Sequence, residues 1–86
     1  MKETPDKEIP REEIEKWLDK IEAIADTIEI ENTKGEEMLQ NMKAYIADSK
    51  HFLEQGDYMR SFEAVIWAWA IFEICTDLGV FTQIVE

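Results

Sequence analysis

Cysteine and histidine are nearly absent from this sequence, with one residue of each. Cys75 alone cannot form an intramolecular disulfide, and His51 cannot combine with it into a recognisable zinc site. The uncharged run 64–72 is too short for a membrane-spanning helix, which needs about 20 residues. We therefore expect no bound metal, no membrane span and a reducing, cytoplasmic setting.

Basic residues are also scarce. The 86 residues include 9 Lys and Arg against 20 Asp and Glu, for a formal net charge of -11. That charge repels phosphate backbones and argues against nucleic acid as a partner. With 45% hydrophobic residues, however, the acidic chain is too apolar to be disordered. A chain of this length predicts a single domain over 1–86.

Apolar residues at three- and four-residue steps predict an all-α fold. We expect helices over about residues 10–30, 34–55 and 57–78. Pro10 suits the first turn of the first helix. Thr33, three residues before Glu36, predicts a capping box at the start of the second.

Two glycines mark the ends of the later helices. Gly56 suits the left-handed conformation that ends a helix, and Asp57 after it suits the N-cap of the next, which makes this pair the structural hinge. So short a connection favours antiparallel neighbours and hence an up-down-up antiparallel three-helix bundle. Gly79 can cap the third helix, and we expect the short C-terminal tail 80–86 to pack back on the bundle in an extended or irregular form.

The third helix is apolar over an unusually wide arc. On a helical wheel its large residues form two groups, separated by small ones. The first group is Tyr58, Phe62, Val65, Trp69 and Phe72; the second is Trp67, Ile71, Ile74 and Leu78; the small residues are Ser61, Ala64, Ala68 and Cys75. Either both neighbouring helices cover this helix entirely, or one apolar edge stays exposed and contacts a second protein.

These alternatives lead to two sets of candidate residues. Interface candidates, at the margin nearest the acidic residues, are Ile66, Trp67, Ala70 and Ile74. Candidates for a ligand pocket between helices are Tyr58, Glu63 and Trp69. A binding pocket should hold Glu63 partly buried, whereas an interaction module should leave it solvated.

Catalytic chemistry has little support. Asp48, His51 and Glu54 fall at three-residue steps on the second helix, which favours a solvated polar face over a metal or base site. Cys75 on an apolar helix favours a small core residue over a nucleophile. We expect no catalytic residues, no metal and no cofactor.

Residues 45–81 resemble the archaeal family known as domain of unknown function 357 (DUF357). The resemblance is strongest over the second and third helices, where ten positions carry it, with Ser61 in place of the more usual alanine. These positions are Gly56, Asp57, Tyr58, Phe62, Glu63, Ala64, Trp67, Ala68, Trp69 and Ala70. The resemblance implies a compact helical bundle from an archaeal cytoplasm, without an assigned activity. It also implies that related domains accompany nucleotidyltransferase-like enzymes.

The first functional hypothesis is a non-catalytic interaction module. It would bind a protein partner, or itself as a homodimer, through the apolar edge of the third helix. The alternative is a small-molecule or nucleotide-binding accessory domain, associated with a nucleotidyltransferase-like enzyme.

Overall fold

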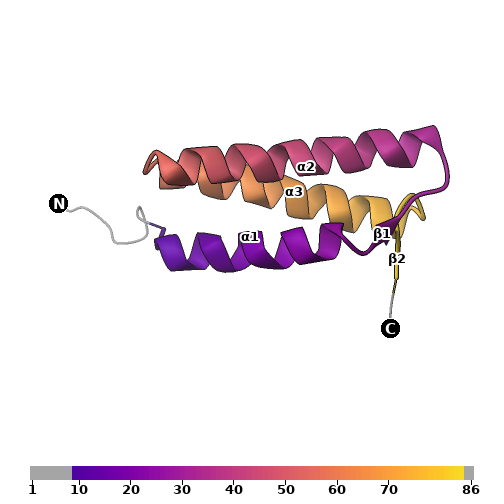
Figure 1. Ribbon diagram of the computed structural model, residues 1–86, viewed down its shortest axis with the longest axis horizontal. Coiled ribbons are helices and arrows are strands. Elements are labelled where there is room, and N and C mark those ends of the chain that lie inside the picture. The colour runs from indigo at the N-terminus through magenta and orange to yellow at the C-terminus, as the bar shows by residue number, and fades with distance from the viewer. Residues whose placement is uncertain (1–8, 85–86) are drawn as a thin grey trace.

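The computed structural model describes residues 9–84 as three helices and two very short strands. In chain order these are α1 (Arg11–Ala25), β1 (Ile28–Glu29), α2 (Thr33–Glu54), α3 (Tyr58–Asp77) and β2 (Thr82–Gln83). The helices run side by side, with the α2–α3 turn at one end of the bundle and the strands at the other (Figure 1). This arrangement confirms the all-α three-helix bundle.

The core lies between the three helices and reaches the C-terminal tail. Its buried apolar residues on α1 recur at the predicted three- and four-residue spacing. The buried apolar side chains are Ile14, Leu18, Ile21, Ala25, Met42, Ile46, Leu53, Ala64, Val65, Ala68, Cys75 and Phe81. Cys75 is therefore a core residue, as predicted.

Helices α2 and α3 form a hairpin with the predicted hinge. Gly56 has φ of 77°, and its N–H donates to the Leu53 carbonyl at 3.1 Å, while the Asp57 N–H donates to Phe52 at 2.9 Å. These two bonds satisfy carbonyls at the end of α2. The Asp57 carboxylate accepts a bond from the Arg60 N–H at 3.2 Å and so caps α3.

Two buried serines join the helices of this hairpin. The Ser49 hydroxyl donates to the Ser61 carbonyl, and the Ser61 hydroxyl donates to the Ser49 carbonyl, both at 2.8 Å. Because both side chains are small and fully buried, the α2 and α3 backbones approach closely here without leaving a polar group unsatisfied.

The expected first helix was too long, because α1 ends at Ala25 and not near residue 30. The Thr27 hydroxyl and N–H both donate to the Ile24 carbonyl, at 2.7 and 2.9 Å, which replaces the next helical bonds with a turn. Ile28 and Glu29 then pair antiparallel with Gln83 and Thr82. The apolar spacing up to residue 28 is compatible with a helix, but residues 28 and 29 instead form a strand that pairs with residues 82 and 83.

The predicted capping box at Thr33 was also wrong. Asn32 is the N-cap of α2, and its side chain accepts a bond from the Gly35 N–H at 2.9 Å, which makes Thr33 the first helical residue. The close packing around position 35 also requires a residue without a side chain. A Cβ there would lie 3.0 Å from Ile30 Cβ and 3.2 Å from the Val80 carbonyl oxygen, so the residue after β1 and the tail both pass close to this turn.

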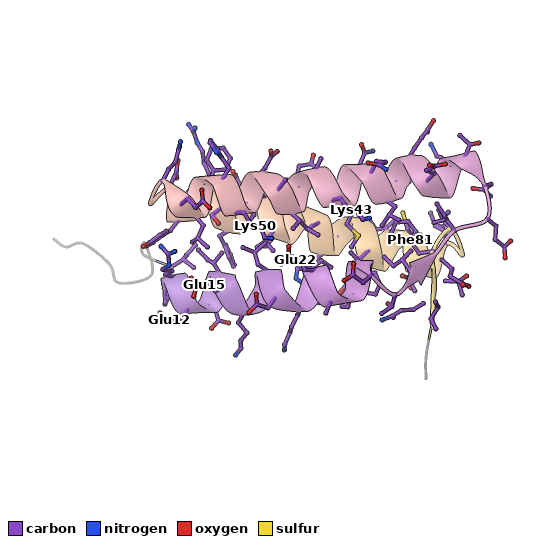
Figure 2. The ribbon with its side chains drawn as sticks, in the orientation of Figure 1. Glu12, Glu15, Glu22, Lys43, Lys50 and Phe81 are labelled. Carbon is purple, nitrogen blue, oxygen red and sulfur yellow. The ribbon has the colours of Figure 1, made fainter. Side chains whose placement is uncertain are left out.

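The tail packs on the bundle, as predicted. Gly79 has φ of 78°, and the Val80 N–H donates to Cys75 at 2.8 Å, which turns the chain back from α3. Phe81 then enters the core with 2% of its surface exposed, close to the end of the bundle that carries the strands (Figure 2). The tail prediction extended to residue 86, and 85–86 lie outside the described residues.

Candidate functional site

The α2–α3 hairpin has two faces, and α1 covers one of them. On that face Trp17 of α1 makes edge contacts with Phe62 and Trp69, with ring centroids 6.1 and 6.0 Å apart. The Trp69 indole N–H donates to the Trp17 carbonyl at 3.3 Å. The first apolar group of α3 is therefore part of the α1–α3 packing.

The other face carries the second apolar group of α3, and much of it meets solvent. Trp67 is 56% exposed, yet its ring is held in place by stacking on Tyr45 of α2, with centroids 6.0 Å apart and an interplanar angle of 18°. Because the indole rests on a neighbouring ring, it is presented to solvent in a defined orientation.

Exposed apolar side chains concentrate on α3. Within residues 9–84, four of the six large exposed hydrophobics belong to this helix, a fifth is its C-cap residue, and the sixth is Ile84 in the tail. The first five are Met59 at 61%, Ile66 at 41%, Trp67 at 56%, Ile74 at 56% and the C-cap Leu78 at 72%. Single exposed hydrophobics need no explanation, but five along one helix and its cap form a candidate interaction surface.

Shallow depressions lie beside the Tyr45–Trp67 stack. One, of about 470 Å³, is bordered by Asn41, Ala44 and Ile71. The other, of about 400 Å³, is bordered by Phe52, Arg60, Glu63 and Ala64. Tyr45, Asp48 and Trp67 line both. We call this surface the Trp67 groove.

Acidic groups predominate beside the stack in the Trp67 groove. Asp48 and Glu63 are exposed carboxylates that line it. Arg60, at one end, lies 3.7 Å from the Asp57 carboxylate and 5.8 Å from the centroid of Phe52. The groove thus joins an apolar ridge to the Asp48 and Glu63 carboxylates, which form no ion pair with any residue of 9–84.

The interface candidates lie together on the outward side of α3. Ile66, Trp67 and Ile74 are exposed and Ala70 is half-buried. Tyr45 was not among the candidates, although its ring supports Trp67. Its neighbours Asn41 and Asp48, three or four residues away and polar, were the available signal that this side of the helix is a margin.

The three pocket candidates do not share a depression among the described residues. Tyr58 is half-buried, and its side-chain oxygen accepts from the Arg11 guanidinium, which raises the pKa of Arg11. Glu63 is exposed, which is the state expected of an interaction module. Trp69 lines a separate hollow of about 280 Å³, together with Lys16, Trp17, Lys20 and Glu73.

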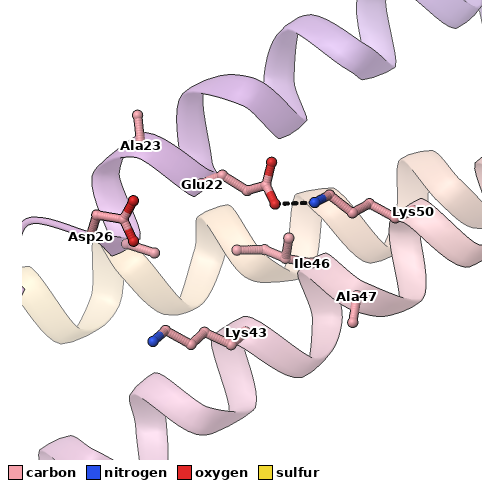
Figure 3. Close-up of a pocket in the computed structure, with 8 residues that line it drawn as sticks. Glu22, Ala23, Asp26, Lys43, Ile46, Ala47 and Lys50 are labelled. Atoms are coloured by element: carbon pink, nitrogen blue, oxygen red, sulfur yellow. Dashed lines mark ion pairs between the residues drawn. The ribbon is translucent and has the colours of Figure 1, made fainter.

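A wider cleft of about 500 Å³ lies between α1 and α2 (Figure 3). Its walls carry two acids and two bases, and Glu22 forms an ion pair with Lys50 across it. The charges of the cleft balance, so it has no net charge with which to attract an ionic ligand. Small residues in the lining, Ala23, Ala25 and Ala47, account for the open space.

Of the residues considered for catalysis, Asp48 lines the Trp67 groove, whereas His51, Glu54 and Cys75 do not. His51 is exposed and contacts the Phe52 ring at a centroid distance of 5.5 Å. Burial raises the pKa of the Cys75 thiol, against a weaker opposite effect of Lys34. Residues 9–84 contain no group of three or more His, Cys, Asp or Glu side chains arranged to hold a metal ion.

Comparison with known proteins assigns the chain to a family. The sequence profile described as "Protein of unknown function (DUF357)" matches residues 12–81. The chain belongs to the DUF357 family. A DUF357 protein of known structure, AF1782 from Archaeoglobus fulgidus, is 43% identical and superposes with a TM-score of 0.78 over 86% of this chain and 92% of that one.

The DUF357 assignment confirms the predicted family and its helical bundle, and the relative of known structure is archaeal. No protein of curated function matches the chain. In the described part of the chain, none of the helices has the length and apolarity required to cross a bilayer. A family without an assigned activity leaves function to be argued from the surface.

Proposed function

We propose that this protein is a non-catalytic interaction module that binds a protein partner, or a second copy of itself, through the outward side of α3. The observation that carries the proposal is the exposure of Trp67, which stays 56% exposed although it is stacked on Tyr45. Tryptophan is enriched where interfaces derive most of their binding energy.

The exposed part of Trp67 is large enough to matter energetically. A little over half of a side chain that buries up to about 250 Å² leaves roughly 140 Å² in water. At about 25 cal/mol per Å², covering that area would contribute about 3.5 kcal/mol to association. Ile74 and Leu78, on the same side of α3, add to this.

The surroundings of Cys75 support a reducing compartment for this function. The only cysteine of the chain is buried in the core as a free thiol. We therefore propose that the module works in the cytoplasm.

The direct test is the substitution Trp67→Glu. Because Trp67 is half exposed, the variant should keep the helical circular dichroism of the wild type. It should lose self-association measured by light scattering at micromolar concentration, or lose proteins that the wild type retains from an extract of its native cells. Glu12→Gln on α1, where Glu12 is exposed, serves as a control and should change neither result.

Two results would contradict the proposal. If Trp67→Glu unfolds the chain, the indole is required by the core. If the variant is folded and retains every association of the wild type, the outward side of α3 is not the binding surface.

The alternative, a small-molecule or nucleotide-binding accessory domain, is favoured by one observation. The hollow at Trp17 and Trp69 combines indole rings with the ammonium groups of Lys16 and Lys20 and one carboxylate, Glu73. The net charge of its lining is positive, which suits an aromatic anion. A titration with ATP followed by tryptophan fluorescence tests it. A saturable change that Lys16→Ala and Lys20→Ala both weaken would support this role, which would fit an accessory of a nucleotidyltransferase-like enzyme.

A further inference from the structure

We infer that the Trp67 groove receives an amphipathic helix of a partner protein, with an apolar stripe flanked by lysine or arginine. This inference rests on the proposed function and specifies the partner. The proposed function allows either another protein or a second copy of this chain to bind. The negative charge of the groove favours a basic helix of another protein.

The helical form of the occupant follows from the way α1 binds the same hairpin. On its covered face, α3 presents Phe62 and Trp69 to a single helix, α1, whose Trp17 packs between them. On its open face α3 presents Trp67, Ile71 and Ile74, and α2 presents Tyr45. A helix laid between α2 and α3 on this side would give four-helix packing, with its side chains in the depressions beside Trp67.

The charge of the occupant follows from the carboxylates around the groove. Asp48 borders both depressions and Glu63 borders one. The single basic residue of α3, Arg60, lies close to Asp57 at the end of the groove. A basic side chain that reaches over the apolar ridge would therefore meet a carboxylate that has no partner among the described residues.

A second copy of this chain fits the groove poorly. Each copy carries a formal charge of -11, and the outward side of α3 has Glu63 and Asp77 among its apolar residues. In a symmetric dimer a surface meets itself. These carboxylates would then face each other, or would be buried against apolar side chains, and both arrangements oppose association.

The dimensions of the surface set the length of the partner helix. From Arg60 to Leu78 the helix rises about 27 Å, at 1.5 Å per residue. The partner helix should therefore have about five turns, or about 18 residues. Its apolar residues should recur at three- and four-residue steps, with lysine or arginine on both margins of the stripe.

The experiment compares two synthetic helical peptides of this length with the same leucine and isoleucine stripe. One has lysine on both margins and the other has glutamate. Each carries a fluorescent label and is titrated with the full chain while anisotropy is recorded, at low and at high salt. Light scattering of the chain alone is measured in parallel.

We expect the lysine peptide to bind at least about tenfold more tightly than the glutamate peptide at low salt. Trp67→Ala should weaken its binding about tenfold or more. The pair Asp48→Asn and Glu63→Gln should weaken it about fivefold and reduce its dependence on salt, because screening then acts on fewer charges.

Matched variants distinguish an effect of the groove carboxylates from an effect of the overall negative charge of the chain. Glu12→Gln with Asp19→Asn removes the same charge from exposed positions of α1 and should leave binding within about twofold of wild type. If Trp67→Ala loses helicity, Ile74→Lys replaces it. Ile74 is 56% exposed, and the new charge should repel the lysine peptide.

Three outcomes would overturn the inference. If both peptides bind equally, the charge of the groove does not select the partner. If the α1 pair and the groove pair of substitutions weaken binding equally, the peptide does not bind in the Trp67 groove. A wild-type dimer that Trp67→Ala dissociates would assign the groove to a second copy. That third outcome would disprove the basic partner helix but would still agree with the proposed interaction module. Failure of the inference can therefore be distinguished from failure of the proposed function.

Discussion

The substitution Phe81→Ala measures how strongly the C-terminal tail holds the bundle together. Phe81 lies after the last helix, yet only 2% of its surface is exposed and it belongs to the core cluster. Truncating a buried phenylalanine to alanine costs about 3–5 kcal/mol. A domain of this length has a free energy of unfolding of about 4–13 kcal/mol in total. The variant should therefore lose between a quarter and most of its stability.

Urea denaturation followed by helical circular dichroism gives this loss directly, provided that the slope of the transition is unchanged. Amide exchange adds a local measurement. The Ile84 N–H donates to the Thr27 carbonyl at 2.9 Å, and it should exchange faster once Phe81 no longer anchors β2 beside β1. The melting temperature should fall by more than about 10 °C, because 1 kcal/mol corresponds to about 4–8 °C in a domain of this size.

The control is Ile84→Ala, since Ile84 is 47% exposed in the same tail and should cost less than about 1 kcal/mol. A loss below about 1 kcal/mol for Phe81→Ala would refute the reasoning. It would mean that residues 9–78 form the stable unit without the tail.

Two further predictions concern the interior. Ser49→Ala and Ser61→Ala should each cost about 0.5–1.5 kcal/mol in urea denaturation. Their effects should couple by about 0.5 kcal/mol or more, because the two hydroxyl oxygens lie 3.1 Å apart in one hydrogen-bond network, and additive effects would show that the two serines act independently. Burial raises the pKa of the Cys75 thiol, so the folded state keeps a proton that the unfolded chain loses above about pH 8.5. The free energy of unfolding should therefore fall with rising pH more steeply than in Cys75→Ala, and equal pH dependence would contradict the assignment.

Much of the fold could be predicted because it depends on neighbouring residues. Gly56 and Asp57 end one helix and begin the next through bonds within a few residues, and Gly79 ends α3 in the same way. The apolar spacing of α1 likewise predicts which of its sides is buried.

The candidate site could be predicted only in part. A wheel of α3 separates Trp67 from Trp69, but it does not say which of the two apolar groups α1 will cover. Trp69, named as a pocket candidate, packs against Trp17, donates to its carbonyl and lines the hollow beside it. Tyr45, whose ring supports the exposed Trp67, was not among the candidate residues.

The sequence alone determined three helices, their hinge, the acidic character of the chain and the excess of apolar surface on the third helix, because each depends on composition or on residues a few positions apart. Only the tertiary structure decided that α1 stops at Ala25, that residues 28–29 pair with 82–83, and that the Trp67 side of the hairpin stays open. These features depend on residues up to 55 positions apart, such as Ile28 and Gln83. The secondary-structure propensity of a short segment does not predict such contacts, because they contribute to stability only when distant segments pack together.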